Sequence, residues 1–121
     1  MIIDVEFYEL PNGTEPVKVF LDSLEPKMKA KMLREIDLLV YNGPELRLPH
    51  LRPVKDGIFE LRAKQGSDIS RVMYFFFVGQ KAVLTNGFIK KSQKADKSEI
   101  ELAKKYKQDY LERESGGEIN E

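Results

Sequence analysis

The sequence predicts a single α+β domain, in which a helical hairpin packs on a small twisted antiparallel sheet in the order β-α-α-β-β-β-α. Helical patterns follow one N-terminal strand pattern and precede three more, and short hairpin turns separate these last three. The 121 residues, 41% of them hydrophobic, suffice for one core but hardly for two. We expect residues 1–114 to form the domain and residues 115–121 to form a flexible C-terminal tail.

In the N-terminal half of the chain, a segment with a strand-like alternating pattern precedes two helical patterns. Residues 2–10 are rich in Ile, Val, Phe and Tyr at alternating positions, which predicts a strand. Thr14 is the expected N-cap of a short amphipathic helix. A second helix is predicted over residues 26–42, because Gly43 and Pro44 form a typical helix end. The apolar stripe of the first helix consists of Val17, Phe20, Leu21 and Leu24.

The sequence of the C-terminal half predicts an antiparallel meander of three strands, followed by a third helix. Residues 44–56 contain three prolines and are expected to be irregular. The run MYFFFV (residues 73–78) is apolar at successive positions and predicts a central strand that is covered on both faces. The third helix should begin near Asp96, with Glu99 completing a capping box, and end near Glu114. The expected strands are residues 57–65, 69–79 and 81–91.

Charge is segregated along the chain although 20 basic and 20 acidic residues balance. Residues 47–97 hold 11 basic and 4 acidic side chains, and we call this segment the basic island. Residues 1–46 hold 5 basic and 9 acidic side chains, and residues 98–121 hold 4 and 7. Salt limits the range of each charge's electric field to about 8–10 Å. Such an island therefore attracts polyanions even on a neutral protein. The alternative is a solvated sheet face with scattered lysines.

The composition excludes several kinds of chemistry. There is no Cys, so disulfides, thiol catalysis and iron–sulfur clusters are excluded. His50 is the only histidine, which argues against a Ser-His-Asp triad or a poly-His metal site, and a structural role is expected for it. No metal or cofactor is expected, because no ligand spacing or nucleotide-binding motif is present. The start of the chain has no signal-peptide pattern and no apolar run could span a membrane, so a cytoplasmic location is expected.

The basic island contains a candidate phosphate-binding cluster. Hairpin pairing should bring the ends of the three predicted strands together at one edge of the sheet. Arginine forks bind phosphate, and a lysine with like-charged neighbours can act as an acid or base. RNA supplies its own nucleophile, the 2′-OH, so cleavage there needs no metal. Each residue also has an ordinary structural explanation. The expected members are Arg62, Lys64, Arg71, Lys90 and Lys91, with Tyr74, Gln93 and Lys94 beside them.

Three segments resemble the RelE/ParE toxin superfamily, and most closely its HigB-like, phage-derived branch. These are ELR (residues 60–62), SRVMYFF (residues 70–76) and GFIKKSQKA (residues 87–95) before the last helix. The resemblance extends over nearly the whole chain. It implies a RelE-like fold and a toxin of a type II toxin–antitoxin system that cuts mRNA in the ribosomal A site without a metal. It also implies a cognate helix-turn-helix antitoxin, a heterotetrameric complex, and contact with operator DNA only through the antitoxin.

The resemblance also implies residue roles. Arg62, Arg71, Lys90 and Lys91 would be the catalytic residues, through contact with the scissile phosphate, charge stabilisation or proton transfer. Tyr74 and Gln93 would bind RNA, and the cation cluster adds Lys64 and Lys94 as further RNA-binding residues. Some relatives carry lysines where this chain has Phe59 and Glu60, so the general base stays open, with Lys64 and Lys90 as candidates. Two alternatives remain: a ParE-like toxin that inhibits gyrase, and a non-catalytic protein that only binds an antitoxin or nucleic acid.

Overall fold

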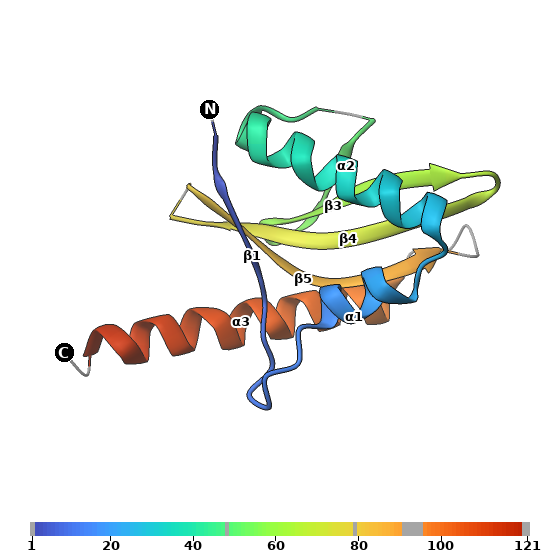
Figure 1. Ribbon diagram of the computed structural model, residues 1–121. Coiled ribbons are helices and arrows are strands. Elements are labelled where there is room, and N and C mark those ends of the chain that lie inside the picture. Colours follow the sequence, from blue (N-terminus) through green and yellow to red (C-terminus); the bar gives the residue numbers. More distant parts are fainter. Residues whose placement is uncertain (1, 48, 79, 91–95, 120–121) are drawn as a thin grey trace.

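The structure is a computed structural model that describes residues 2–47, 49–78, 80–90 and 96–119, with side chains described as far as residue 115. It confirms the predicted α+β class: three helices pack on a five-stranded mixed sheet (Figure 1). The elements in chain order are β1 (Asp4–Phe7), α1 (Pro16–Ser23), α2 (Pro26–Asn42), a 3-10 turn (Gly43–Glu45), β2 (Leu51–Lys55), β3 (Ile58–Gln65), β4 (Asp68–Phe77), β5 (Lys81–Lys90) and α3 (Lys97–Ile119).

The sheet has the strand order β1-β5-β4-β3-β2 and is covered on both faces. Helix α2 lies on one face and the long α3 lies on the other (Figure 1), and α1 shares the core of α2. Val72 and Tyr74 of β4 belong to the core under α1 and α2, whereas Met73 and Phe75 belong to the clusters under α3. The prediction of a central strand covered on both sides is therefore confirmed for β4.

Two features of the sheet differ from the prediction. β1 pairs in parallel with β5, so the sheet is mixed and not purely antiparallel. The segment expected to be irregular contains β2, which pairs with β3 as an edge strand. Pro53 argued against a strand there, but an edge strand tolerates a proline because its outward N–H needs no partner. The pairing also shifts register between Pro53 and Lys55, as a β-bulge does.

The helix ends agree with the prediction in part. α2 spans the predicted residues and ends at Gly43, whose φ is 55°. The N-cap of α1 is Glu15 and not Thr14. The Glu99 carboxylate accepts a hydrogen bond from Asn86 on β5, so it ties α3 to the sheet. α3 continues five residues beyond Glu114, because glycine lowers helix propensity by only about 1 kcal/mol and does not prevent a turn from forming. The flexibility of the C-terminal tail stays a prediction.

A one-residue bulge in β5 decides which of its side chains face α3. Met73 of β4 pairs with Asn86, but the next residue pairs with Leu84, so Thr85 is the extra residue. Its hydroxyl donates to the Met73 carbonyl oxygen at 3.2 Å. After the bulge Phe88 packs in a cluster under α3, and Lys90 shares its face. Val83 faces α3, and side chains alternate between the two faces along a strand. Without the bulge, Phe88 and Lys90 would therefore face α1 and α2.

Candidate functional site

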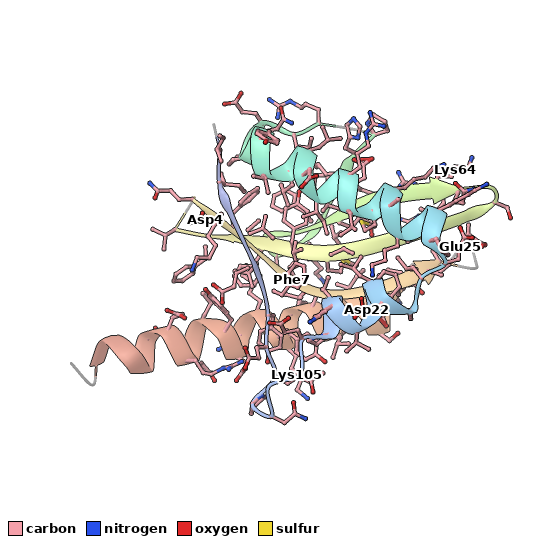
Figure 2. All side chains as sticks on the ribbon, in the orientation of Figure 1. Asp4, Phe7, Asp22, Glu25, Lys64 and Lys105 are labelled. Carbon is pink, nitrogen blue, oxygen red and sulfur yellow. The ribbon has the colours of Figure 1, made fainter. Side chains whose placement is uncertain are left out.

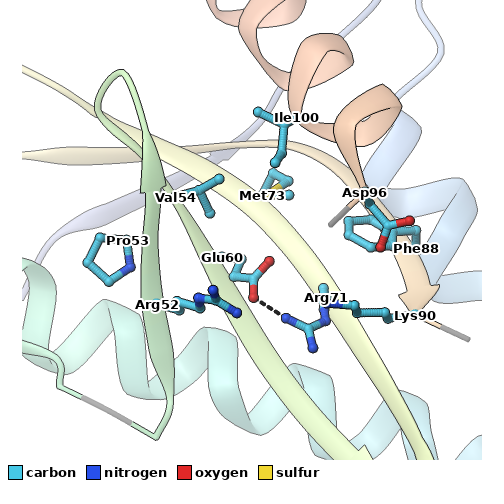
Figure 3. A pocket seen from close by; sticks show the side chains of 10 residues that line it. All are labelled: Arg52, Pro53, Val54, Glu60, Arg71, Met73, Phe88, Lys90, Asp96 and Ile100. Atoms are coloured by element: carbon cyan, nitrogen blue, oxygen red, sulfur yellow. Dashed lines mark hydrogen bonds and ion pairs between the residues drawn. The ribbon is translucent and has the colours of Figure 1, made fainter. Parts of the chain in front are cut away.

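A cleft of about 330 Å³ opens on the α3 face of the sheet (Figure 3). Its lining combines cations and carboxylates with an apolar floor, and comes from four strands and the first turns of α3. Its size falls in the range of about 300–1,000 Å³ that is usual for ligand sites. The lining residues are Arg52, Pro53, Val54, Glu60, Arg71, Met73, Phe88, Lys90, Asp96 and Ile100.

The cations of the cleft come from three different strands. Arg52 lies on β2 and pairs across to Glu60 of β3, so both side chains lie on the α3 face. Arg71 lies on β4 and pairs across to Phe88. Lys90 ends β5 and reaches this face because of the bulge at Thr85. Sheet pairing therefore brings together three positive charges from residues that are separated by up to 38 positions along the chain.

Glu60 and Arg71 form a buried ion pair at the base of the cleft (Figure 3). Glu60 is 5% exposed and Arg71 is 4% exposed. Nη1 of the guanidinium donates to the Glu60 carboxylate, whereas Nε has no partner in the part of the chain that the structure describes. An arginine held on one side by a carboxylate has its other donors directed away from that carboxylate, and these can bind an anion.

The predicted cations Arg62, Lys64, Arg71 and Lys90 share the α3 face of the sheet. Arg62 is the direct cross-strand partner of Arg71. Lys64 pairs with Ile69, which in turn pairs with Lys90, so the three lie in one row across the strands. Arg62 and Lys64 are not among the residues that line the cleft, and Lys64 lies near the β3–β4 turn (Figure 2). The register thus gathers all four residues at one end of the sheet.

Tyr74 lies elsewhere. It faces α1 and α2, on the opposite side of the sheet, and is 0% exposed. Its ring stacks on Phe59 with 5.6 Å between the centroids, and burial raises the pKa of its hydroxyl. The predicted place of Tyr74 beside the cations is therefore wrong, because odd and even positions of β4 face opposite sides. Lys91, Gln93 and Lys94 lie outside the described residues, and their roles stay predictions.

His50 also lies outside the lining of the cleft. Its Nδ1 lies 2.9 Å from a carboxylate oxygen of Glu35 on α2, and its carbonyl oxygen accepts from the backbone N–H of Arg62. These contacts attach the segment before β2 to α2 and β3. They agree with the structural role expected for this histidine.

Arg52, Glu60, Phe88 and Asp96 line the cleft but were not predicted from the sequence. A usable signal existed for Glu60. The two-residue turn at Gly66 sets Arg62 opposite Arg71, and two like charges that face each other across strands need a counter-charge. Glu60 is the acidic residue at the diagonal position. No comparable signal existed for Arg52, because its strand was not predicted.

The cleft can bind an anionic ligand that also carries an apolar part. Arg52, Arg71 and Lys90 supply positive charge, and the half-buried Phe88 ring supplies a flat apolar surface. Among the described residues no group of three or more His, Asp or Glu side chains could hold a metal ion. Within the same residues no helix is long and apolar enough to cross a bilayer.

A family model supports the toxin resemblance. The model described as "Phage derived protein Gp49-like (DUF891)" matches residues 19–108, which is well over half of the chain. The chain therefore belongs to this family, which is a RelE/HigB-like family associated with the toxins of toxin–antitoxin systems. The match contains every described residue of the cleft. No curated protein matches the chain.

Proposed function

We propose that this protein is the toxin of a type II toxin–antitoxin system and that it cleaves mRNA in the ribosomal A site, in the cytoplasm. The observation that carries the proposal is the convergence of Arg52, Arg71 and Lys90 on one cleft beside the carboxylate of Glu60. Family membership supports the toxin role. A helix-turn-helix antitoxin is the proposed neutralising partner, in line with the sequence resemblance.

In the proposed reaction the RNA 2′-OH attacks the adjacent phosphorus atom and the P–O5′ bond breaks. The products are a 2′,3′-cyclic phosphate and a 5′-OH. Arg71 and Lys90 bind the phosphate oxygens, and their charge stabilises the dianionic transition state. Arg62, next to Arg71 across the strands, adds positive potential. Lys91, with Gln93 and Lys94, belongs to the same proposal through the sequence resemblance.

The two proton transfers need a base and an acid. Glu60 is the carboxylate next to Arg71, and we assign it as the base that takes the 2′-OH proton. Lys90, at the opposite side of Arg71 along the cleft wall, is the matching donor to the leaving O5′ atom (Figure 3). Phe88, which replaces Tyr74 as the aromatic residue of the site, stacks on a base.

Primer extension on mRNA from a translating extract tests the proposal. Wild-type protein is expected to produce A-site cuts, while Lys90→Ala reduces cutting by 100-fold or more. Glu60→Gln should have the same effect, and its cutting is compared only under conditions in which circular dichroism shows it folded, because it removes the charged partner of the buried Arg71. Lys18→Ala, an exposed change on α1 on the other face of the sheet, is the matched control and should cut normally. Inhibition of gyrase supercoiling without RNA cuts would instead establish the ParE-like alternative. If neither activity is detected, the remaining alternative is a non-catalytic protein that only binds an antitoxin or nucleic acid.

A further inference from the structure

The two edges of the sheet differ in how they are protected. The β2 edge carries Pro53, a register shift and the exposed cations Arg52 and Lys55, all of which hinder pairing with another chain. The β1 edge has no proline and no register shift. Asp4 and Phe7 mark the two ends of this short strand in Figure 2.

The outer backbone groups of β1 are free to pair. The N–H groups of Asp4 and Tyr8 donate to carbonyl oxygens of Gln80 and Leu84, so even-numbered positions point toward β5. With a period of two, the N–H and C=O groups of Val5 and Phe7 point away from β5. β1 ends the strand order, and no strand in the described part of the chain pairs with this side.

Exposed apolar side chains surround the start of the same edge. Ile2 is 71% exposed, Tyr41 is 63% exposed and Val78 is 77% exposed. Ile3 N–H donates to the carbonyl oxygen of Val40, so Tyr41 lies near the outer side of the strand, whereas Asp4 N–H donates to Gln80 and places Val78 near the β5 side. Exposed apolar side chains beside an open edge are typical of a protein-binding surface.

The charge of this edge selects its partner. Asp4 is exposed and Glu6 is half-buried, and both lie on the α3 face, whereas Val5 and Phe7 pack toward the core under α1 and α2. Glu6 binds Lys81 Nζ at 2.9 Å and accepts a hydrogen bond from the Tyr110 hydroxyl, so Asp4 is the carboxylate that selects a partner. Any second copy that paired here with its apolar positions aligned would set carboxylates opposite carboxylates, which is unfavourable. A strand with a basic residue opposite Asp4, and apolar residues opposite Val5 and Phe7, fits both faces.

We propose that the outer edge of β1, with Ile2 and Tyr41, binds an extended segment of a partner protein in which apolar and basic residues alternate. The segment extends the sheet by one strand. This inference does not depend on RNA cleavage. Only the identification of the partner as an antitoxin rests on the proposed function.

Titration with two synthetic hexapeptides tests the inference, one alternating Lys with Val and one alternating Glu with Val. In amide NMR spectra the basic peptide should shift the signals of Val5 and Phe7 and slow their hydrogen exchange, and the acidic peptide should not. Val5→Pro removes an outward N–H and leaves the bonds to β5 intact, so binding should weaken at least ten-fold. Val5→Ala is the matched control for the lost side chain.

Asp4→Lys provides a second measurement in case Val5→Pro does not fold. This exposed substitution should reverse the preference between the two peptides while leaving the edge open. The inference is overturned if the basic peptide leaves Val5 and Phe7 unshifted, if both peptides bind alike, or if Asp4→Lys keeps the wild-type preference. Self-association of the protein through β1 in sedimentation experiments would assign the edge to a second copy and overturn it as well.

Discussion

At the scale of single residues, Glu60 and Arg71 are the clearest case of a structural contact inside a candidate site. Both side chains are buried, so removing one leaves an unpaired charge in the interior. Arg71→Ala should therefore lower the free energy of unfolding by about 3–5 kcal/mol. The double variant Glu60→Leu/Arg71→Met should cost much less, because it removes both charges and keeps most of the volume.

Urea denaturation of the single and double variants measures this coupling. Arg52→Ala is the control, since this exposed cation of the same cleft should change stability by no more than about 0.5 kcal/mol. A single variant as stable as the double variant would show that the pair is not buried in solution. The expected loss of stability also means that lost toxicity in Arg71→Ala does not by itself report catalysis, so Lys90→Ala is the better activity probe.

Gly87 shows how closely α1 approaches the sheet. A Cβ atom at this position would lie 2.3 Å from Cδ2 of Phe20, well inside contact distance. Gly87→Ala should lower the melting temperature, with a cost of about 1–3 kcal/mol typical of overpacking. Combining it with Phe20→Ala should remove the clash, so the double variant should lose less than the two single losses added together. Calorimetry of the four proteins measures the difference.

At the scale of elements, α3 is held to Tyr8, the residue after β1, by a polar contact as well as by packing. The Tyr8 hydroxyl donates to Asp109 at 2.6 Å, and Arg113 also donates to that carboxylate. The hydrogen bond from Tyr8 is the main cause that lowers the pKa of Asp109. Burial, together with this bond, raises the pKa of Tyr8 to about 12.

The two shifts predict opposite pH dependences. The Asp109 contribution is fully present above the ordinary pKa of 3.8 and is lost as the pH falls through the lowered value. The Tyr8 contribution is present below pH 10.0 and is lost as the pH rises toward about 12. Asp109→Asn should flatten the acid side of the stability profile and Tyr8→Phe the alkaline side. Chemical denaturation across pH measures both, and unchanged profiles would show that the contact does not form.

The elements also show what periodicity could and could not predict. α2 was predicted to the residue because Pro26 and the Gly43-Pro44 pair mark both ends. β2 was missed because Pro53 was taken to argue against a strand, whereas proline is compatible with an edge strand. The bulge at Thr85 was not predicted either, since one extra residue leaves no mark in the composition, yet it decides that Lys90 reaches the cleft. Tyr74 was misplaced for a different reason: it was placed by its distance from Arg71 along β4, whereas odd and even positions of a strand face opposite sides.

At the scale of the whole molecule, the charge of this neutral chain is segregated between two surfaces. The basic island supplies Arg52, Arg71 and Lys90 to the cleft, whereas the acidic N-terminal segment supplies Asp4 to the edge at β1. The proposed RNA-binding cleft and the proposed partner-binding edge therefore differ in charge. The convergence of Arg71 and Lys90 was predictable from topology, because hairpins bring strand ends together, and the counter-charge of Glu60 could have been inferred from the Arg62–Arg71 pairing, whereas Arg52 could not.

The affinity for RNA should therefore depend on salt concentration through a small number of phosphate contacts. For single-stranded RNA the logarithm of the binding constant falls with the logarithm of salt concentration by about 0.7 per phosphate contact. Lys90→Ala should reduce this slope by about 0.7, and so should Arg52→Ala, because each removes one phosphate contact. Lys18→Ala, a loss of the same charge on the far face of the sheet, should leave the slope unchanged. Fluorescence anisotropy with a labelled oligoribonucleotide measures all four slopes. Equal slopes in the three variants would mean that net charge, and not the cleft, determines binding.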